Sequence, residues 1–116
     1  MAGLPEAHLA VVDERKVRSY LLANSHPAGR AKAAFFRQFG FRASSWQNLS
    51  AALMEHALNA EVASVTATAF GTKYMLEGAI EARDGRTPRI RTVWFVANGE
   101  TAPRLVTAYP VPRVNR

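Results

Sequence analysis

The stretch RIRTVWFVA, residues 89–97, decides the fold class. Six of its nine residues are β-branched or aromatic, which predicts a β-strand because such side chains pack well on a pleated surface. Successive side chains of a strand point to opposite faces of the sheet. One face would carry Ile90, Thr92, Trp94 and Val96, and the other Arg89, Arg91, Val93 and Phe95. At least one of the two neighbouring aromatic rings therefore belongs to the core.

Three further strands are predicted on the two sides of this stretch. The chain before it contains Asp84-Gly85, a dipeptide typical of a hairpin turn, and the chain after it contains Asn98-Gly99. Pro103 lengthens the second connection and delays the next strand, because proline donates no hydrogen bond to a ladder. The three strands are expected at residues 62–68, 73–81 and 104–109. In the last of them, Leu105, Thr107 and Tyr109 are expected to share one face, opposite Arg104, Val106 and Ala108.

The first half of the chain has apolar residues at helical spacing and predicts three helices. Each begins at residues that favour a helix N-terminus: Asp13, the pair His26-Pro27, and Ser44 or Ser45. The second helix is expected to end at Gly40, because glycine readily adopts the left-handed conformation of a helix C-cap. The third runs to Asn59. The predicted fold class is α+β, with three N-terminal helices packed on one face of a four-stranded antiparallel meander sheet.

Length and composition indicate one domain. The chain has 116 residues, of which 48% are hydrophobic, enough for a single core. Residues 1–12 have weak periodicity and are expected to be a partly ordered lead-in, with a single α+β domain at 13–110 and a C-terminal tail at 111–116. There is no run of eighteen apolar residues and no signal peptide at the N-terminus. We therefore expect no membrane partner and a cytoplasmic location.

Metal and cofactor chemistry is not expected. The chain has no cysteine, which excludes disulfides and thiolate ligands. Its three histidines, His8, His26 and His56, are too scattered in sequence to form a metal cluster by spacing. The acidic residues are too dispersed for a two-metal nuclease, and no glycine-rich phosphate loop is present.

The charge distribution points to an anionic partner. Fifteen Lys and Arg against nine Asp and Glu give a formal net charge of +6. Seven basic residues and no acid lie between Glu14 and Glu55, and seven arginines against two acids lie between Arg83 and Arg116. Such a field favours encounter with RNA or with an acidic protein. The same charge distribution is equally compatible with a solvated surface that only keeps the protein soluble. The sequence is also compatible with an oligomer.

A sheet covered by helices on one face leaves the other face open for binding. If Lys73, Arg91 and a hydroxyl from Thr107 or Tyr109 share this face, they would suit a phosphodiester. The alternative is that these residues only solvate a half-exposed sheet. The register between the strands decides between the two, and it is not readable from the sequence.

His26 is the candidate catalytic histidine. It lies at the expected start of the second helix, where the helix dipole disfavours the imidazolium form and where anions bind. Arg30 and Lys32 follow within two turns. A neutral imidazole beside cations could act as general base or acid in RNA cleavage without a metal. The alternative is a capping role for His26, and His56 is expected to be a structural histidine on the core side of the third helix.

Three segments together resemble a small, uncharacterised bacterial family, found as stand-alone proteins and as C-terminal modules of polymorphic-toxin-like chains. They are NSHPAGRAKAAFFRQFGF at 24–41, FGTKYMLEGAIEARDGRTPRIRTVW at 70–94, and PRLVTAYP at 103–110. The element order also resembles the barnase, EndoU, colicin and RelE group of metal-independent ribonucleases, whose sites lie on the sheet. The resemblance implies a toxin beside a small acidic antitoxin-like protein, although fold alone does not settle function.

Two functions remain open at this point, beside a third possibility, a structural subunit of a larger assembly. The first is a toxin-type endoribonuclease that cleaves RNA by 2′-hydroxyl attack. Its catalytic residues would be His26, Lys32, Arg91 and Tyr109, and its RNA-binding residues Lys73, Arg89, Thr107 and Arg30. The second is a non-catalytic basic module that binds an acidic protein or nucleic acid through the same surface.

Overall fold

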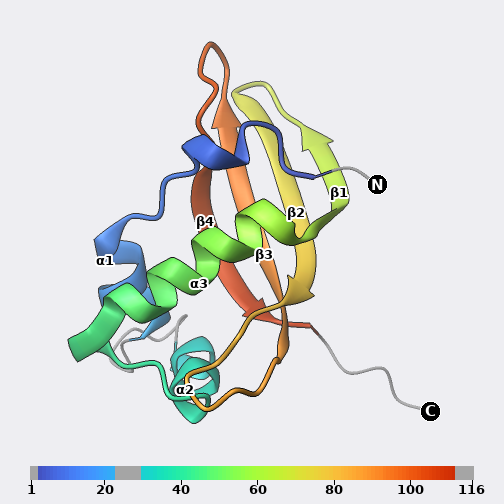
Figure 1. Cartoon of the computed structure of the whole chain (residues 1–116). Coiled ribbons are helices and arrows are strands. Elements are labelled where there is room, and N and C mark those ends of the chain that lie inside the picture. The colour runs from blue at the N-terminus through green and yellow to red at the C-terminus, as the bar shows by residue number, and fades with distance from the viewer. Residues whose placement is uncertain (1–2, 23–29, 112–116) are drawn as a thin grey trace.

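The computed structural model of the chain describes residues 3–22 and 30–111. Four antiparallel strands form one sheet in the order β1-β2-β3-β4. They are β1 (Glu61–Ala67), β2 (Gly71–Ala79), β3 (Arg89–Ala97) and β4 (Arg104–Pro110). The helices precede the sheet in the chain and lie against one of its faces (Figure 1). The predicted α+β fold with an antiparallel meander is confirmed.

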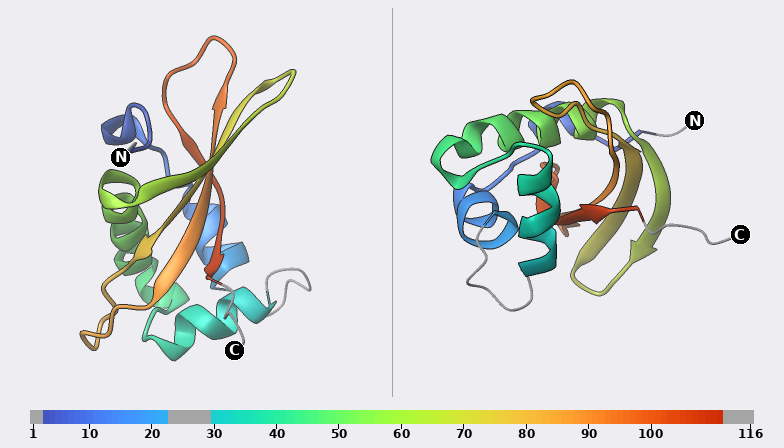
Figure 2. Two further views of the ribbon diagram at one scale, coloured as in Figure 1. Left: turned by 90° about the vertical axis from the view of Figure 1, so that its right-hand side faces the viewer. Right: turned by 90° about the horizontal axis from the view of Figure 1, so that it is seen from below.

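Within the described residues, the helical layer consists of three helical segments and two short 3-10 turns. The segments are α1 (Glu14–Lys16), which continues as a π-helical stretch over Val17–Leu21, then α2 (Arg30–Gln38) and α3 (Trp46–Asn59). The 3-10 turns are Ala7–Leu9 and Ala43–Ser45. Figure 2 shows α3 lying along the sheet and α2 at its lower end, where α2 meets β4. No helix of the described ranges is long and apolar enough to cross a bilayer.

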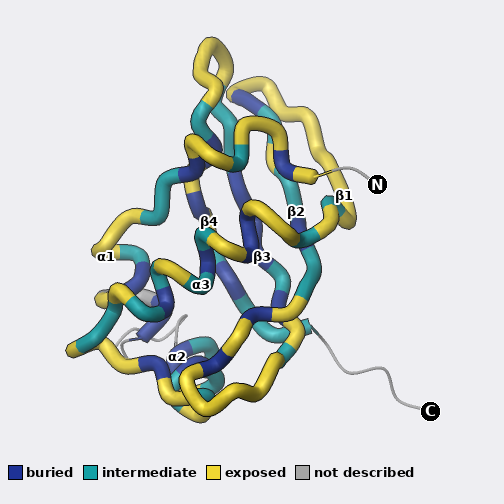
Figure 3. The backbone as a smooth tube through the Cα atoms, in the orientation of Figure 1, coloured by how far each residue is buried: buried dark blue, intermediate teal, exposed yellow. Residues whose placement is uncertain are grey.

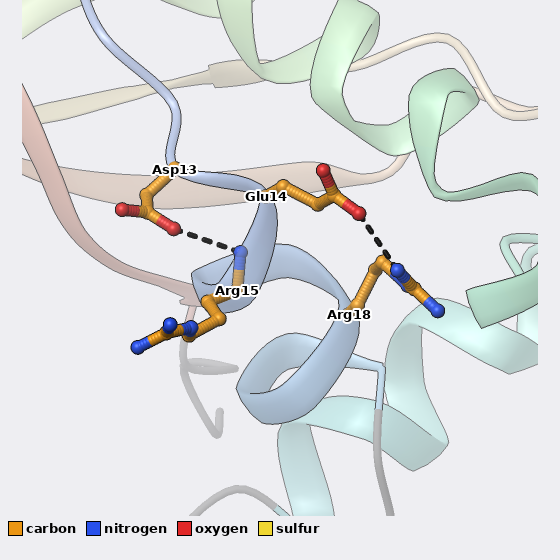
Figure 4. A pocket seen from close by; sticks show the side chains of 4 residues that line it. All are labelled: Asp13, Glu14, Arg15 and Arg18. Carbon is orange, nitrogen blue, oxygen red and sulfur yellow. Dashed lines mark hydrogen bonds and ion pairs between the residues drawn. The ribbon is translucent and has the colours of Figure 1, made fainter.

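The helix ends follow the expected capping residues in part. Asp13 precedes α1, and its carboxylate accepts a hydrogen bond of 2.8 Å from the Arg15 backbone N–H (Figure 4). Ser45 occupies the N-cap position of α3, but its side chain makes no capping hydrogen bond. The predicted start of the second helix at His26-Pro27 lies outside the described residues.

Gly40 ends α2 as predicted. Its φ of +93° lies in the left-handed region. The Gly40 N–H donates to the Arg37 carbonyl at 3.0 Å, and the Phe41 N–H donates to the Phe36 carbonyl at 3.1 Å. This is the Schellman arrangement, in which an apolar contact between the flanking residues completes the cap. The rings of Phe36 and Phe41 supply that contact edge to face, and both are buried.

The core fills the space between the helices and the covered face of the sheet. Trp94 on β3 is fully buried there, whereas Phe95 lies on the opposite face and is partly exposed. Figure 3 shows β3 buried over much of its length and β1 exposed along almost all of it. The segment before α1 also joins the core through Leu4 and Ala10. It is held to β4 by backbone hydrogen bonds on both sides of Val11.

A buried hydrogen-bond chain crosses the interface between α3 and the sheet. His56, 2% exposed, contacts the Gly78 carbonyl through Nε2 at 3.2 Å and the Thr92 hydroxyl through Nδ1 at 2.9 Å. A carbonyl only accepts, so Nε2 carries the proton, and Nδ1 of the neutral ring accepts from the Thr92 hydroxyl. The Trp94 indole N–H donates to the same hydroxyl oxygen at 2.8 Å. His56 is therefore the structural histidine that its position predicts.

Acid is expected to destabilise the protein through His56. Burial lowers the pKa of His56 below its usual 6.5, against smaller opposing contributions from backbone hydrogen bonds. The unfolded chain therefore binds a proton at a pH where the folded chain does not. The contribution of His56 to the free energy of unfolding is fully present above about pH 6.5. It is lost at lower pH, with a slope of up to about 1.4 kcal/mol per pH unit. Urea unfolding between pH 7.5 and 5 measures the slope, and His56→Gln should reduce it; equal slopes for both proteins would contradict this role.

Candidate functional site

The face of the sheet turned away from the helices, here called the open face, carries the candidate site. The register of the strands aligns four residues, one from each strand, in a row across the sheet. Glu61 on β1 pairs with Glu77 on β2, Glu77 with Arg91 on β3, and Arg91 with Tyr109 on β4. Paired residues of neighbouring strands share a face, so these four side chains lie side by side on the open face.

A β-bulge in β4 decides which of its residues reach the open face. Thr107 pairs with Val93 and Leu105 pairs with Trp94, and the pairing shifts between the two. Val106 is the extra residue of this bulge, which inverts the alternation beyond it. Leu105 is consequently buried in the core while Thr107 lies on the open face. The predicted common face of Leu105, Thr107 and Tyr109 is therefore wrong, because a bulge changes the period of two.

A hollow of about 370 Å³ lies on the open face. All four strands contribute to its lining: Ser64 and Thr66, Lys73 and Met75, Val93, and Val106, Thr107 and Tyr109. In a flat sheet the backbones of the first and fourth strands would be about 14 Å apart. Both edge strands line this one hollow, so the sheet curves around it, as Figure 2 shows for the strands. Three of the residues singled out from the sequence, Lys73, Thr107 and Tyr109, are thus brought together.

Arg91 supplies a permanent cation beside this hollow. Its guanidinium donates a hydrogen bond to the Glu77 carboxylate, with both side chains partly buried. This hydrogen bond is the main reason why the pKa of Arg91 is raised, and the Tyr109 hydroxyl adds a smaller contribution. Arg91 therefore stays charged at any physiological pH. The condition that Arg91 shares the open face with Lys73 is therefore met, whereas its partner Glu77 was not expected from the sequence.

Thr107 has an unused hydroxyl. Its Oγ1 atom is buried, and it is the one such side-chain atom in the described residues that lacks a hydrogen-bond partner. A buried polar group without a partner is costly, so a native protein rarely keeps one without a reason. The residue lines the hollow, and Oγ1 itself is closed to solvent, so a bound molecule would reach it once the side chain turns about χ1. The hydroxyl is therefore a candidate contact for a ligand.

The remaining predicted site residues lie away from the hollow or outside the described residues. Arg89, at the start of β3, borders two other depressions, of about 380 and 780 Å³. Lys32 lies on α2, which packs at the end of the sheet. The side chain of Arg30 and the whole of His26 lie outside the described residues. The meeting of the His26 imidazole with the open face stays a prediction.

A further depression of about 590 Å³ is explained by helix capping. It is lined by Asp13, Glu14, Arg15 and Arg18 (Figure 4). Asp13 caps α1, and Glu14 forms an ion pair of 2.7 Å with Arg18 one turn later. Both carboxylates have partners within the helix, so we do not assign a ligand to this place. Within the described ranges, no group of three or more histidine and acidic residues is arranged to hold a metal ion.

The sequence matches the family described as "Domain of unknown function (DUF6883)" over residues 3–112. The chain belongs to this family. The match takes in all four strands of the open face and the segment before α1, so the site described above lies within the family domain. No curated protein matches the chain.

The fold is shared with a solved structure. A chain of the "Contact-dependent growth inhibition toxin - immunity protein complex from Klebsiella pneumoniae 342" is similar to this DUF6883 domain with a TM-score of 0.71. The likeness covers 92% of this chain and 97% of that chain, at 16% sequence identity. At this identity it establishes a common architecture.

Five of the eight residues that line the hollow were not among the site residues predicted from the sequence. Ser64 and Thr66 come from β1, whose side chains could not be assigned to a face because of a second bulge between Val62 and Ser64. Met75, Val93 and Val106 form the apolar part and were placed on the correct strands without a role. The alternation of these residues with core residues along their strands was the signal that could have placed them on the open face.

Proposed function

We propose that this protein is a toxin-type endoribonuclease that needs no metal and is neutralised by a small acidic partner protein. The observation that supports it is the gathering of Lys73, Thr107 and Tyr109 in one hollow, with Arg91 beside Tyr109. Cations and hydroxyl groups of this kind bind a phosphodiester and stabilise the extra negative charge of its transition state.

The proposed reaction is attack by the 2′-hydroxyl on the adjacent phosphorus. A general base removes the 2′-hydroxyl proton, a bond forms between the 2′-oxygen and phosphorus, and the 5′-oxygen leaves with a proton from a general acid. The products are a 2′,3′-cyclic phosphate and a 5′-hydroxyl. Arg91 and Lys73 neutralise the phosphorane, Tyr109 and Thr107 position the scissile group, and His26 serves as base or acid in this proposal.

The comparisons support a toxin-like role at the level of fold. The similar chain comes from a complex of a growth-inhibition toxin with its immunity protein. The formal net charge of +6 favours the toxin side for this chain, because a nuclease must attract a polyanion and its inhibitor is then best acidic. The same charge supports an acidic protein partner.

A second candidate function is a non-catalytic module that binds RNA or an acidic protein. It is favoured by the ion pair between Glu77 and Arg91, because this pair neutralises the cation that lies beside Tyr109. Binding through these residues would need no general base.

Expression in bacterial cells distinguishes the two candidates. The wild type should arrest growth and leave RNA fragments that end in a 2′,3′-cyclic phosphate, and chelators should not slow the purified protein. The double variant Lys73→Ala, Tyr109→Phe should cleave at least about tenfold more slowly, since it loses a cation and a hydroxyl from the phosphate site. His26→Ala should be inactive if the imidazole is the base or acid.

The matched control is Arg18→Ala. It removes the same charge from an ion pair with Glu14 that lies on α1 and its continuation, away from the open face. This variant should remain as toxic as the wild type. If the purified wild type binds RNA and leaves it intact at high protein concentration, the protein is a binding module.

A further inference from the structure

We infer that the open-face hollow receives a single unpaired nucleotide, so that the substrate class is single-stranded or looped RNA and not duplex RNA. The inference rests on the proposed function, because it specifies which RNA that site would bind. It is carried by the width, the lining and the unused hydroxyl of the hollow.

The width of the hollow admits one nucleotide and excludes a duplex. Ser64 and Thr66 lie on the first strand, Val106 and Thr107 on the fourth, and all four line the same volume of about 370 Å³. The backbones of these strands are at most about 14 Å apart, and their side chains narrow the space further. The bases of a double helix are stacked and paired inside it, so only an unpaired or extruded base can enter such a space.

The hollow is apolar in the middle, with Lys73 in its lining at one end and Arg91 beside it at the other. Met75 and Val93 are register partners in the row that Thr107 completes, and Val93 is only 8% exposed although it lies on the open face. Lys73 lies on one side of this row, and Arg91 with Tyr109 on the other. Along a strand these two ends are separated by four residues, about 13 Å. A base would pack on the apolar middle while its flanking phosphates meet a cation at each end.

The Thr107 hydroxyl supplies a polar contact inside the hollow. Its buried Oγ1 has no partner in the protein, although the neighbouring middle of the hollow is apolar. A turn of the Thr107 side chain would bring Oγ1 to the surface of the hollow, where a base edge or a sugar hydroxyl would satisfy it. A duplex that stays outside would leave it unsatisfied, so this hydroxyl adds to the preference for an unpaired nucleotide.

Binding of three RNA probes with 2′-fluoro sugars tests the inference, since they lack the 2′-hydroxyl that the proposed cleavage requires. The probes are a single strand, a blunt duplex, and a duplex with one central unpaired nucleotide, compared at one salt concentration. The single strand and the bulged duplex should bind at least about tenfold more tightly than the blunt duplex. Equal or tighter binding of the blunt duplex, or no binding of any probe, would overturn the inference.

Two matched variants locate the bound nucleotide. Ser64→Glu adds a charge inside the hollow, and Val65→Glu adds the same charge to the next residue, which is 56% exposed on the opposite face. The first should weaken single-strand binding about tenfold and the second less than about twofold. Thr107→Val should weaken single-strand binding about fivefold and leave duplex binding unchanged. Equal effects of the two glutamate variants would place the nucleotide elsewhere and overturn the inference.

The same probes separate this inference from the proposed function. Selective binding of the 2′-fluoro single strand without cleavage of the matching unmodified RNA would refute the nuclease and leave the inference standing. Cleavage of unmodified RNA with equal affinity for duplex and single strand would refute the inference and leave the nuclease standing.

Discussion

Replacing Thr92 by valine is expected to lower the free energy of unfolding by about 3 kcal/mol. Valine has nearly the shape of threonine, so the substitution removes a hydroxyl and leaves the packing. Thr92 is fully buried and hydrogen-bonds both the Trp94 indole at 2.8 Å and His56 Nδ1 at 2.9 Å. Both partners would stay buried without a hydrogen bond, at a cost of about 1–3 kcal/mol each. Urea unfolding followed by tryptophan fluorescence measures the change.

Thr107→Val is the matched control for this prediction. It makes the same substitution one strand away, where the buried hydroxyl has no partner to lose. Its free energy of unfolding should change by less than about 0.5 kcal/mol, or rise, because an unsatisfied buried group is removed. An equal loss of stability in the two valine variants would show that Thr92 does not hold His56 and Trp94 through its hydroxyl.

The elements of the fold were predictable because their signals are local. The stretch at 89–97 became a strand with the expected ends, since its β-branched and aromatic side chains suit a pleated surface. Gly40, Gly85 and Gly99 all adopt positive φ at the expected helix end and turns. The conformations of these residues are determined by preferences that act within a few positions of the chain.

The register of β2 and β3 was signalled without being recognised. Every pair of this ladder, from Gly71 with Ala97 to Ala79 with Arg89, is equidistant along the chain from Asp84. The hairpin is therefore centred on the Asp84-Gly85 turn that the sequence indicates. A register centred there places Glu77 opposite Arg91, so the ion pair beside the hollow follows from the turn.

The outline of the hollow was not predictable, because it depends on irregularities set by tertiary packing. The bulge at Val106 turns Thr107 toward the open face and Leu105 toward the core, and no local preference announces it. The curvature of the sheet, which brings β1 opposite β4, is likewise a property of the whole sheet. The alternation of side chains along the predicted strands led to Lys73 and Tyr109 as site residues, whereas the proposed role of His26 rests on sequence reasoning alone.

Arg91→Ala is expected to reduce the rate of RNA cleavage by about 100- to 1,000-fold, the largest effect of any substitution on the open face. Arg91 is a permanent cation placed between Glu77 and Tyr109. Removing it would take a positive charge from the phosphorane and leave Glu61 and Glu77 as a pair of neighbouring carboxylates that repel the phosphate. Single-turnover cleavage of a labelled single-stranded RNA measures the loss.

Two further variants decide whether Arg91 acts on the substrate or only supports the sheet. Arg91→Lys keeps the charge but loses the fork that contacts a phosphate at two points, so it should recover only part of the rate. Glu77→Gln keeps Arg91 and releases it from its ion pair, so RNA should bind a few-fold more tightly. A purely structural Arg91 would give the opposite pattern: Glu77→Gln would weaken binding and cleavage together with stability. Because Glu77 competes with a phosphate for the same guanidinium, tighter binding in Glu77→Gln is the result that assigns Arg91 to the RNA.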